Sequence, residues 1–119
     1  MKYMVMMFGS AEEMLGTQTP EWITEMIQFM RDLDHELRES GELVASEGLV
    51  DGSQAKLVRR TDDGFTVTDG PFAESKESLV GYWVLDVENE ARILELSGRI
   101  VKWSDVVEVR RVADGPPEI

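Results

Sequence analysis

Four ionisable side chains lie close together in one short stretch of the sequence, Val67–Glu77, which reads VTDGPFAESKE. They are Asp69, Glu74, Lys76 and Glu77. Neighbouring carboxylates can take different pKa values and serve as acid and base, and loops held by a rigid scaffold often carry such groups. We therefore expect Asp69 to be an acid/base or ligand-anchoring carboxylate, with the other three as further ligand contacts.

The same stretch also has a purely architectural interpretation. Asp69 can cap a turn with its side chain, Gly70 allows an unusual backbone angle and Pro71 restricts φ. Phe72 then fills a place in the core, and Lys76 makes an ordinary surface ion pair that contributes little to stability. The sequence thus leaves two roles open for Asp69: a side chain that caps a turn, or a carboxylate in a functional site.

Three further charged residues are candidates for contact with a ligand. Glu47 lies in a segment that is otherwise small or apolar, and a carboxylate that points inward there must be paired or protonated. Arg59 and Arg110 each belong to a basic doublet, in which strand alternation sends neighbouring side chains to opposite faces. Solvated charge on a strand explains both arginines. The alternative is that one of them points into a pocket and pairs with Asp69 or an anionic ligand.

The single histidine, His35, lies between Asp34 and Glu36 in a predicted helix. Helical periodicity places it near the charged side, which predicts a solvated surface residue; the alternative is a general base beside a carboxylate. The absence of cysteine excludes thiolate chemistry, and one histidine with scattered carboxylates gives no metal-ligand spacing. No phosphate loop or dinucleotide fingerprint is present. We predict neither a metal nor a cofactor.

Composition limits the class of protein. A chain of 119 residues predicts one domain, residues 1–119. Its 24 acidic and 12 basic residues give a formal net charge of -12, which disfavours binding to nucleic acid. The apolar segment Met1–Phe8 is too short to span a bilayer and lacks the flanks of a signal peptide. We expect a soluble, cytoplasmic protein with no nucleic-acid or membrane partner.

Hydrophobic periodicity predicts two helices. The stronger signal begins after the N-cap Thr19, carries apolar residues three and four positions apart, and ends at Gly41. A shorter helix is predicted over residues 88–96, with Gly98 marking its end. Between Ser10 and Thr19 we expect a loop with a helical turn at residues 11–15.

Six segments have the composition of strands: residues 2–8, 42–49, 55–60, 65–68, 79–87 and 105–112. The Asp63-Gly64 pair predicts a tight turn between the third and the fourth. The order of strand, helix, group of strands, helix and strand is typical of a ferredoxin-like α+β fold, in which both helices cover one face of an antiparallel sheet.

The open face of such a sheet would be apolar. Tyr82 and Trp83 are neighbours in the most hydrophobic strand, so their side chains point to opposite faces. A monomer would leave a broad apolar face in water, which soluble monomers seldom do. We therefore predict a homodimer through the open face of the sheet, with the strand Leu79–Val87 in the interface.

Several motifs together resemble the YCII-related family. The run DGPFAESKE, with Gly41-Glu42-Leu43, Glu47-Gly48-Leu49, Gly81-Tyr82 and Val107-Glu108-Val109-Arg110, is similar to the branch of that family named for its DGPF motif. The resemblance covers almost the whole chain. It implies a dimeric α/β barrel of the ferredoxin-like type. It also implies a function that is largely unassigned, in a setting often linked to sigma factors of the extracytoplasmic-function type.

Two functions remain open from the sequence. The first is a small enzyme or small-molecule-binding domain that takes a polar or cationic metabolite in a pocket near the DGPF loop, beside Asp69. The second is a non-catalytic regulatory or interaction domain in which the motif is structural. Some related YCII proteins are proposed to use a His–Asp pair with the histidine nearer Met30, and His35 departs from that position. We do not extend that mechanism to this chain.

Overall fold

The computed structural model describes residues 1–70 and 78–117. Its main body is a four-stranded antiparallel sheet with the strand order β2-β5-β1-β6. The strands are β1 (Lys2–Gly9), β2 (Leu43–Gly48), β5 (Ser78–Asp86) and β6 (Val107–Arg111). The two outer strands, β2 and β6, do not pair with each other, so this sheet is not closed into a barrel.

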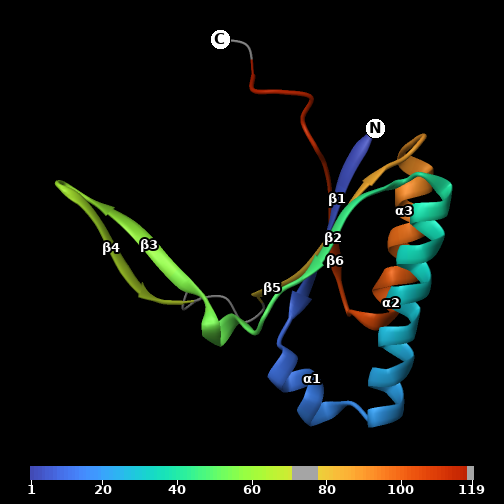
Figure 1. Ribbon diagram of the computed structural model, residues 1–119, viewed down its shortest axis with the longest axis horizontal. Helices are drawn as coiled ribbons and strands as arrows, with labels where there is room; N and C mark the ends of the chain where they lie inside the picture. Colours follow the sequence, from blue (N-terminus) through green and yellow to red (C-terminus); the bar gives the residue numbers. More distant parts are fainter. Residues whose placement is uncertain (71–77, 118–119) are drawn as a thin grey trace.

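Three α-helices accompany the described strands: α1 (Ala11–Thr17), α2 (Pro20–Ser40) and α3 (Glu90–Ile100). Figure 1 shows α2 and α3 side by side on one face of the main sheet. Two 3₁₀ turns, η1 (Gly52–Gln54) and η2 (Val101–Trp103), complete the elements. In the part of the chain that the structure describes, no helix combines the length and the hydrophobicity needed to cross a membrane.

The long helix predicted from the sequence is confirmed at both ends. The Thr19 hydroxyl accepts a hydrogen bond from the Trp22 amide at 3.1 Å, which satisfies one free donor of the first turn. Gly41 follows the last residue of α2 with φ of 79°, the left-handed conformation that glycine adopts without steric cost.

Two predicted boundaries are wrong. The helical turn predicted at residues 11–15 is confirmed but extends to the helix Ala11–Thr17, so the predicted loop is shorter than expected. The Ser10 hydroxyl caps this helix by accepting from the Glu13 amide at 3.2 Å. The helix α3 continues past Gly98 to Ile100, which is fully buried against the core. A glycine costs a helix only about 1 kcal/mol, and burial of a large aliphatic side chain offsets that cost.

The core lies between the main sheet and the helices. The strands contribute Tyr3, Val5, Trp83 and Leu85, and α3 contributes Ile93, Leu96 and Ile100. From α2, only Leu33 and Leu37 are buried. The apolar residues nearer the start of α2 are at most half-buried, so the first half of this helix has an apolar face that the sheet does not cover.

The other face of the main sheet is apolar and uncovered by the described residues. Pairing of β1 with β5 places Met6 opposite Tyr82 and Met4 opposite Val84, on the face away from Trp83. All four side chains are half-buried. The predicted apolar open face is thus confirmed, whereas the homodimer that would cover it stays a prediction.

Strands β3 (Lys56–Thr61) and β4 (Gly64–Asp69) form a separate two-stranded sheet, the β3–β4 arm. The arm projects from the body on the side of the main sheet away from the helices (Figure 1). The hairpin predicted around Asp63-Gly64 is confirmed, because Thr61 pairs with Gly64 across the turn. Residues 71–77, which include Phe72, lie outside the described residues, so its predicted place in the core stays a prediction.

Candidate ligand-binding cavity

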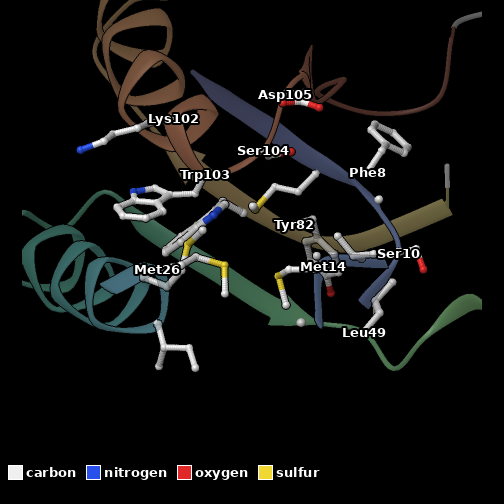
Figure 2. Close-up of a pocket in the computed structure, with 18 of the residues that line it drawn as sticks. Phe8, Ser10, Met14, Met26, Leu49, Tyr82, Lys102, Trp103, Ser104 and Asp105 are labelled. Atoms are coloured by element: carbon white, nitrogen blue, oxygen red, sulfur yellow. The ribbon is translucent and has the colours of Figure 1, made fainter. Parts of the chain in front are cut away.

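A cavity of about 880 Å³ lies beside the sheet, at the end of β1 where that strand leads into α1. Its walls come from α1, the part of α2 between Trp22 and Asp34, the turn η2, and the adjoining parts of β1, β2 and β5. Figure 2 shows Met26 and Trp103 at one end of this cavity and Ser10 and Leu49 at the other. The volume falls in the range of about 300–1,000 Å³ that is usual for small-molecule sites.

The cavity exists because the start of α2 leaves its apolar face unfilled. Trp22, Met26 and Met30 continue the apolar stripe of the helix, yet each is only half-buried and lines the cavity. Met7 from β1 and Met14 from α1 lie on the facing walls and are also half-buried. Methionine side chains adapt their shape to irregular apolar partners, so this lining suits the hydrophobic part of a ligand.

An aromatic cluster forms one end of the cavity. The Trp103 ring packs edge-on against Trp22, with ring centroids 5.3 Å apart, and tilts against Phe29 at 5.8 Å. The Lys102 ammonium lies 5.1 Å from the centre of the Trp103 ring. Trp103 Nε1 is buried and has no hydrogen-bond partner among the described residues. Such a donor costs about 1–3 kcal/mol while it stays unpaired, which marks this wall as incomplete.

Asp34 supplies a fixed carboxylate to the wall. Its Oδ1 accepts from the Ser46 hydroxyl at 2.9 Å, and its Oδ2 accepts from Arg38 Nε at 2.8 Å. The Arg38 hydrogen bond is the main cause of a lowered pKa for the Asp34 carboxyl, with Ser46 adding to it and partial burial opposing both. The side chain is therefore ionised at neutral pH and held in one orientation.

The charges around the cavity are mostly negative. Among the described residues that line it, four carboxylates face two cations: Glu13, Asp34, Glu47 and Asp105 against Arg31 and Lys102. This balance favours a cationic or neutral ligand over an anion. No group of three or more metal-ligating side chains able to hold an ion is found in the part of the chain that the structure describes.

Comparison with known proteins assigns a family. A model of the YCII-related domain matches residues 1–115. The chain belongs to the YCII-related family. An uncharacterised protein of Rhizobium meliloti (strain 1021) is 40% identical over 60 residues, which make up 48% of this chain and 48% of that protein. The chain thus spans about half the length of this relative, and neither match carries an activity.

Of the site residues predicted from the sequence of this YCII-related protein, the structure brings Glu47 to the cavity. Glu47 is exposed, and strand pairing places it opposite Tyr82, which also lines the cavity. A paired or protonated carboxylate was expected only if the Glu47 side chain pointed inward. Because the side chain is exposed, this expectation does not apply.

Asp69 lies elsewhere. It ends β4 on the β3–β4 arm, its carboxylate pairs with the Lys56 ammonium, and its side chain is 83% exposed. The Gly70 amide donates to the Ala55 carbonyl at 2.8 Å, and a Cβ on Gly70 would meet Leu57 Cγ at 3.2 Å. These contacts favour the architectural interpretation of the Asp69-Gly70 turn. An acid/base role for Asp69 stays a prediction, and Glu74, Lys76 and Glu77 lie outside the described residues.

The two arginine candidates are not among the described residues that line the cavity. Arg59 is exposed on β3 of the arm. Arg110 is exposed on β6, where its Nε lies 3.8 Å from a carboxylate oxygen of Glu108. Asp69 pairs with the Lys56 ammonium. The predicted pairing of Asp69 with an arginine stays a prediction.

Sequence reasoning missed most of the cavity. His35 is exposed, as predicted, and its neighbour Asp34 is the residue that lines the cavity. One signal was available: the apolar stripe of α2 begins at Trp22, well before the positions that pack on the sheet. That stripe alone gives no indication that Trp103 and Met14, from distant segments, meet it.

Proposed function

We propose that this YCII-related protein binds a small organic amine with a hydrophobic or aromatic body, in the cavity beside Asp34. The observation that carries the proposal is one fixed carboxylate next to a half-exposed wall of methionine and tryptophan. Trp22, Met26 and Trp103 would cover the apolar body, and covering it is worth about 25 cal/mol per Å². The Asp34 carboxylate would accept a charge-assisted hydrogen bond from the amine.

The geometry supports binding better than proton transfer. A general base works best when its pKa lies near the operating pH, and the pKa of Asp34 is shifted down, away from neutrality. His35, the other conventional base near this helix segment, is exposed and does not line the cavity. A non-catalytic, ligand-sensing role also agrees with the regulatory function that the sequence left open.

Membership of the DGPF branch is part of this proposal, and the run DGPFAESKE itself supports it. The residue that follows this run, Ser78, lies beside the cavity. Gly9 and Val80 line the cavity. The Ser78 hydroxyl, directly after residues 71–77, donates to the Gly9 carbonyl at 3.4 Å. The chain therefore returns to the body beside the cavity at the end of the DGPFAESKE run.

The second part of the proposal concerns the assembly. The strand order β2-β5-β1-β6, with α2 and α3 on one face, supports a ferredoxin-like arrangement. The uncovered face that carries Met4, Met6 and Tyr82 supports a homodimer, in which two facing sheets would form the barrel implied by the family resemblance. The acidic, cysteine-free composition supports the predicted cytoplasmic location.

A competition experiment tests the ligand class. The probe is N-phenyl-1-naphthylamine, a neutral dye that fluoresces in apolar cavities, and the competitors are phenethylamine, phenethyl alcohol and phenylacetate. We expect saturable dye binding and displacement by the amine at a concentration about tenfold lower than by phenylacetate, since a favourable charge contact of about 1.4 kcal/mol changes affinity tenfold.

Two aspartates on α2 provide the matched variants. Asp34→Asn removes the charge from the cavity and should reduce the difference between amine and carboxylate to less than about threefold, the factor for 0.65 kcal/mol or so. Asp32→Asn is the control, because Asp32 is exposed, accepts from Gln28 at 2.8 Å and does not line the cavity. The absence of saturable dye binding, a preference for phenylacetate, or equal effects of both variants would contradict the proposal.

A further inference from the structure

The β3–β4 arm is a structure that needs support from outside itself. Each of its strands has six residues, and the pair forms a sheet of only two strands. An isolated two-stranded hairpin is marginally stable in water, and three strands or a packed partner are needed for stability. The arm projects away from the helices and the core (Figure 1).

One face of the arm is apolar and exposed. The register pairs Val58 with Val67 and Arg60 with Phe65, so these four side chains lie on the same face. The exposed fractions are 65% for Val58, 69% for Phe65 and 54% for Val67. The opposite face carries Thr66 and Thr68, paired with Arg59 and with the half-buried Leu57. Three large exposed apolar side chains thus lie on one face, and a more polar set lies on the other. This asymmetry is typical of a strand pair that packs against a partner on one side.

The arm and the open face of the main sheet border the same space. The helices cover one face of that sheet, and the arm extends on the other side (Figure 1). The uncovered face there carries the half-buried Met4, Met6 and Tyr82. A body that packs on this face therefore lies alongside the arm. One partner can cover both apolar surfaces.

Charge favours a second copy of this chain as that partner. Between Lys56 and Asp69 the arm has three basic residues (Lys56, Arg59, Arg60) and three acidic ones (Asp62, Asp63, Asp69), so its net charge is zero. The net charge of the whole chain, -12, therefore belongs entirely to the remaining residues. A neutral arm can approach an acidic copy without repulsion, and Arg60 beside the apolar stripe places a cation toward it.

We propose that the arm of one copy packs its Val58, Phe65 and Val67 face against a second copy, which sits on the open face of the main sheet. This inference rests on the homodimer proposed above and adds a second contact to it. Two-fold symmetry makes the contact occur twice, so each copy is held by the arm of the other. The arm is then ordered by the dimer.

Sedimentation equilibrium on two double variants of the full chain tests the inference. Phe65→Asp with Val67→Asp places two charges on the apolar face of β4. Thr66→Asp with Thr68→Asp places the same two charges on the opposite face of the same strand. We expect the first variant to raise the dimer dissociation constant at least 30-fold and the second to change it by less than about threefold, since each tenfold change corresponds to 1.4 kcal/mol.

Hydrogen exchange of the arm amides gives a readout that does not depend on substitution. We expect protection of the β3 and β4 amides at protein concentrations where the dimer forms, and its loss on dilution to monomer. Circular dichroism checks that both variants keep the fold of the main body. A dimer that responds equally to both variants, or to neither, overturns the role of the arm and leaves the sheet contact standing. A wild-type chain that is monomeric at micromolar concentration overturns both.

Discussion

The ion pair between Glu42 and Arg92 connects the start of β2 to α3 and provides a sharp test of the fold. Arg92 Nε donates to Glu42 Oε2 and Arg92 Nη2 donates to Glu42 Oε1, both at 2.9 Å. The Ser40 hydroxyl also donates to Oε1 at 2.8 Å. Only 16% of the Glu42 side chain and 28% of the Arg92 side chain are exposed. Two parallel charge-assisted bonds of this kind are among the stronger polar contacts in proteins.

Glu42→Gln is the informative change, because it keeps the shape and removes the charge. The amide nitrogen of Gln cannot accept from Arg92, so one of the two hydrogen bonds is lost and the other is weakened. Hydrogen bonds to charged groups contribute about 1.5–3 kcal/mol each, so we expect a loss of about 2 kcal/mol in the free energy of unfolding. For 119 residues this corresponds to a fall in Tm of about 8 °C.

The effect should depend on pH. The Arg92 hydrogen bonds hold the pKa of the folded Glu42 carboxyl below its ordinary value. A group with a lowered folded pKa stabilises the fold fully above its unfolded pKa, and this contribution is lost as the pH falls through the folded pKa. The difference in the free energy of unfolding between wild type and Glu42→Gln should therefore have its full size at pH 7. It should shrink below about pH 4, near the unfolded pKa of a glutamate.

Urea unfolding at one fixed protein concentration measures this difference in unfolding free energy at pH 7 and at about pH 3. Glu39→Gln serves as control, since Glu39 is exposed on α2 and an exposed substitution changes stability by less than about 0.5 kcal/mol. Two results would refute the reasoning. One is a Glu42→Gln variant that loses no more unfolding free energy than this control at pH 7. The other is a loss at pH 3 as large as the loss at pH 7.

Three further substitutions have expected outcomes. Leu37→Ala, at a fully buried position between α2 and the sheet, should lower the free energy of unfolding in urea by about 2–5 kcal/mol. Gly41→Ala should cost about 1 kcal/mol in the same assay, because φ of 79° is unfavourable for alanine. Asp69→Asn should leave the chain folded and should not change displacement of the dye by phenethylamine, since Asp69 does not line the cavity; loss of displacement would restore Asp69 as a site residue.

Local signals in the sequence were sufficient for much of the fold. The ends of α2 follow from Thr19 and Gly41, whose capping roles depend on a few neighbouring residues. The alternation of Tyr82 and Trp83 predicts the two faces of β5, because strand geometry has a strict period of two. The hairpin of the arm follows from Asp63-Gly64. The resemblance to the YCII-related family is confirmed by the match over residues 1–115, whereas membership of its DGPF branch stays a prediction.

Features that depend on tertiary packing were not predictable in the same way. The helix α3 passes through Gly98 because Leu96 and Ile100 are buried, and local propensity does not register that burial. The cavity forms because the start of α2 extends beyond the sheet that covers the rest of this helix. It also depends on Trp103, which contacts Trp22 from a distant segment of the sequence. The densest cluster of charge in the sequence drew attention to Asp69, which is 83% exposed on the arm, whereas the partly buried carboxylate in the cavity wall is Asp34.

A crystal structure of the protein grown with phenethylamine would test the central claim most directly. We predict that the ring lies in the cavity against Trp22 and Trp103, with its nitrogen about 3 Å from a carboxylate oxygen of Asp34. The claim would be contradicted by an empty cavity with the amine bound at Asp69 on the arm.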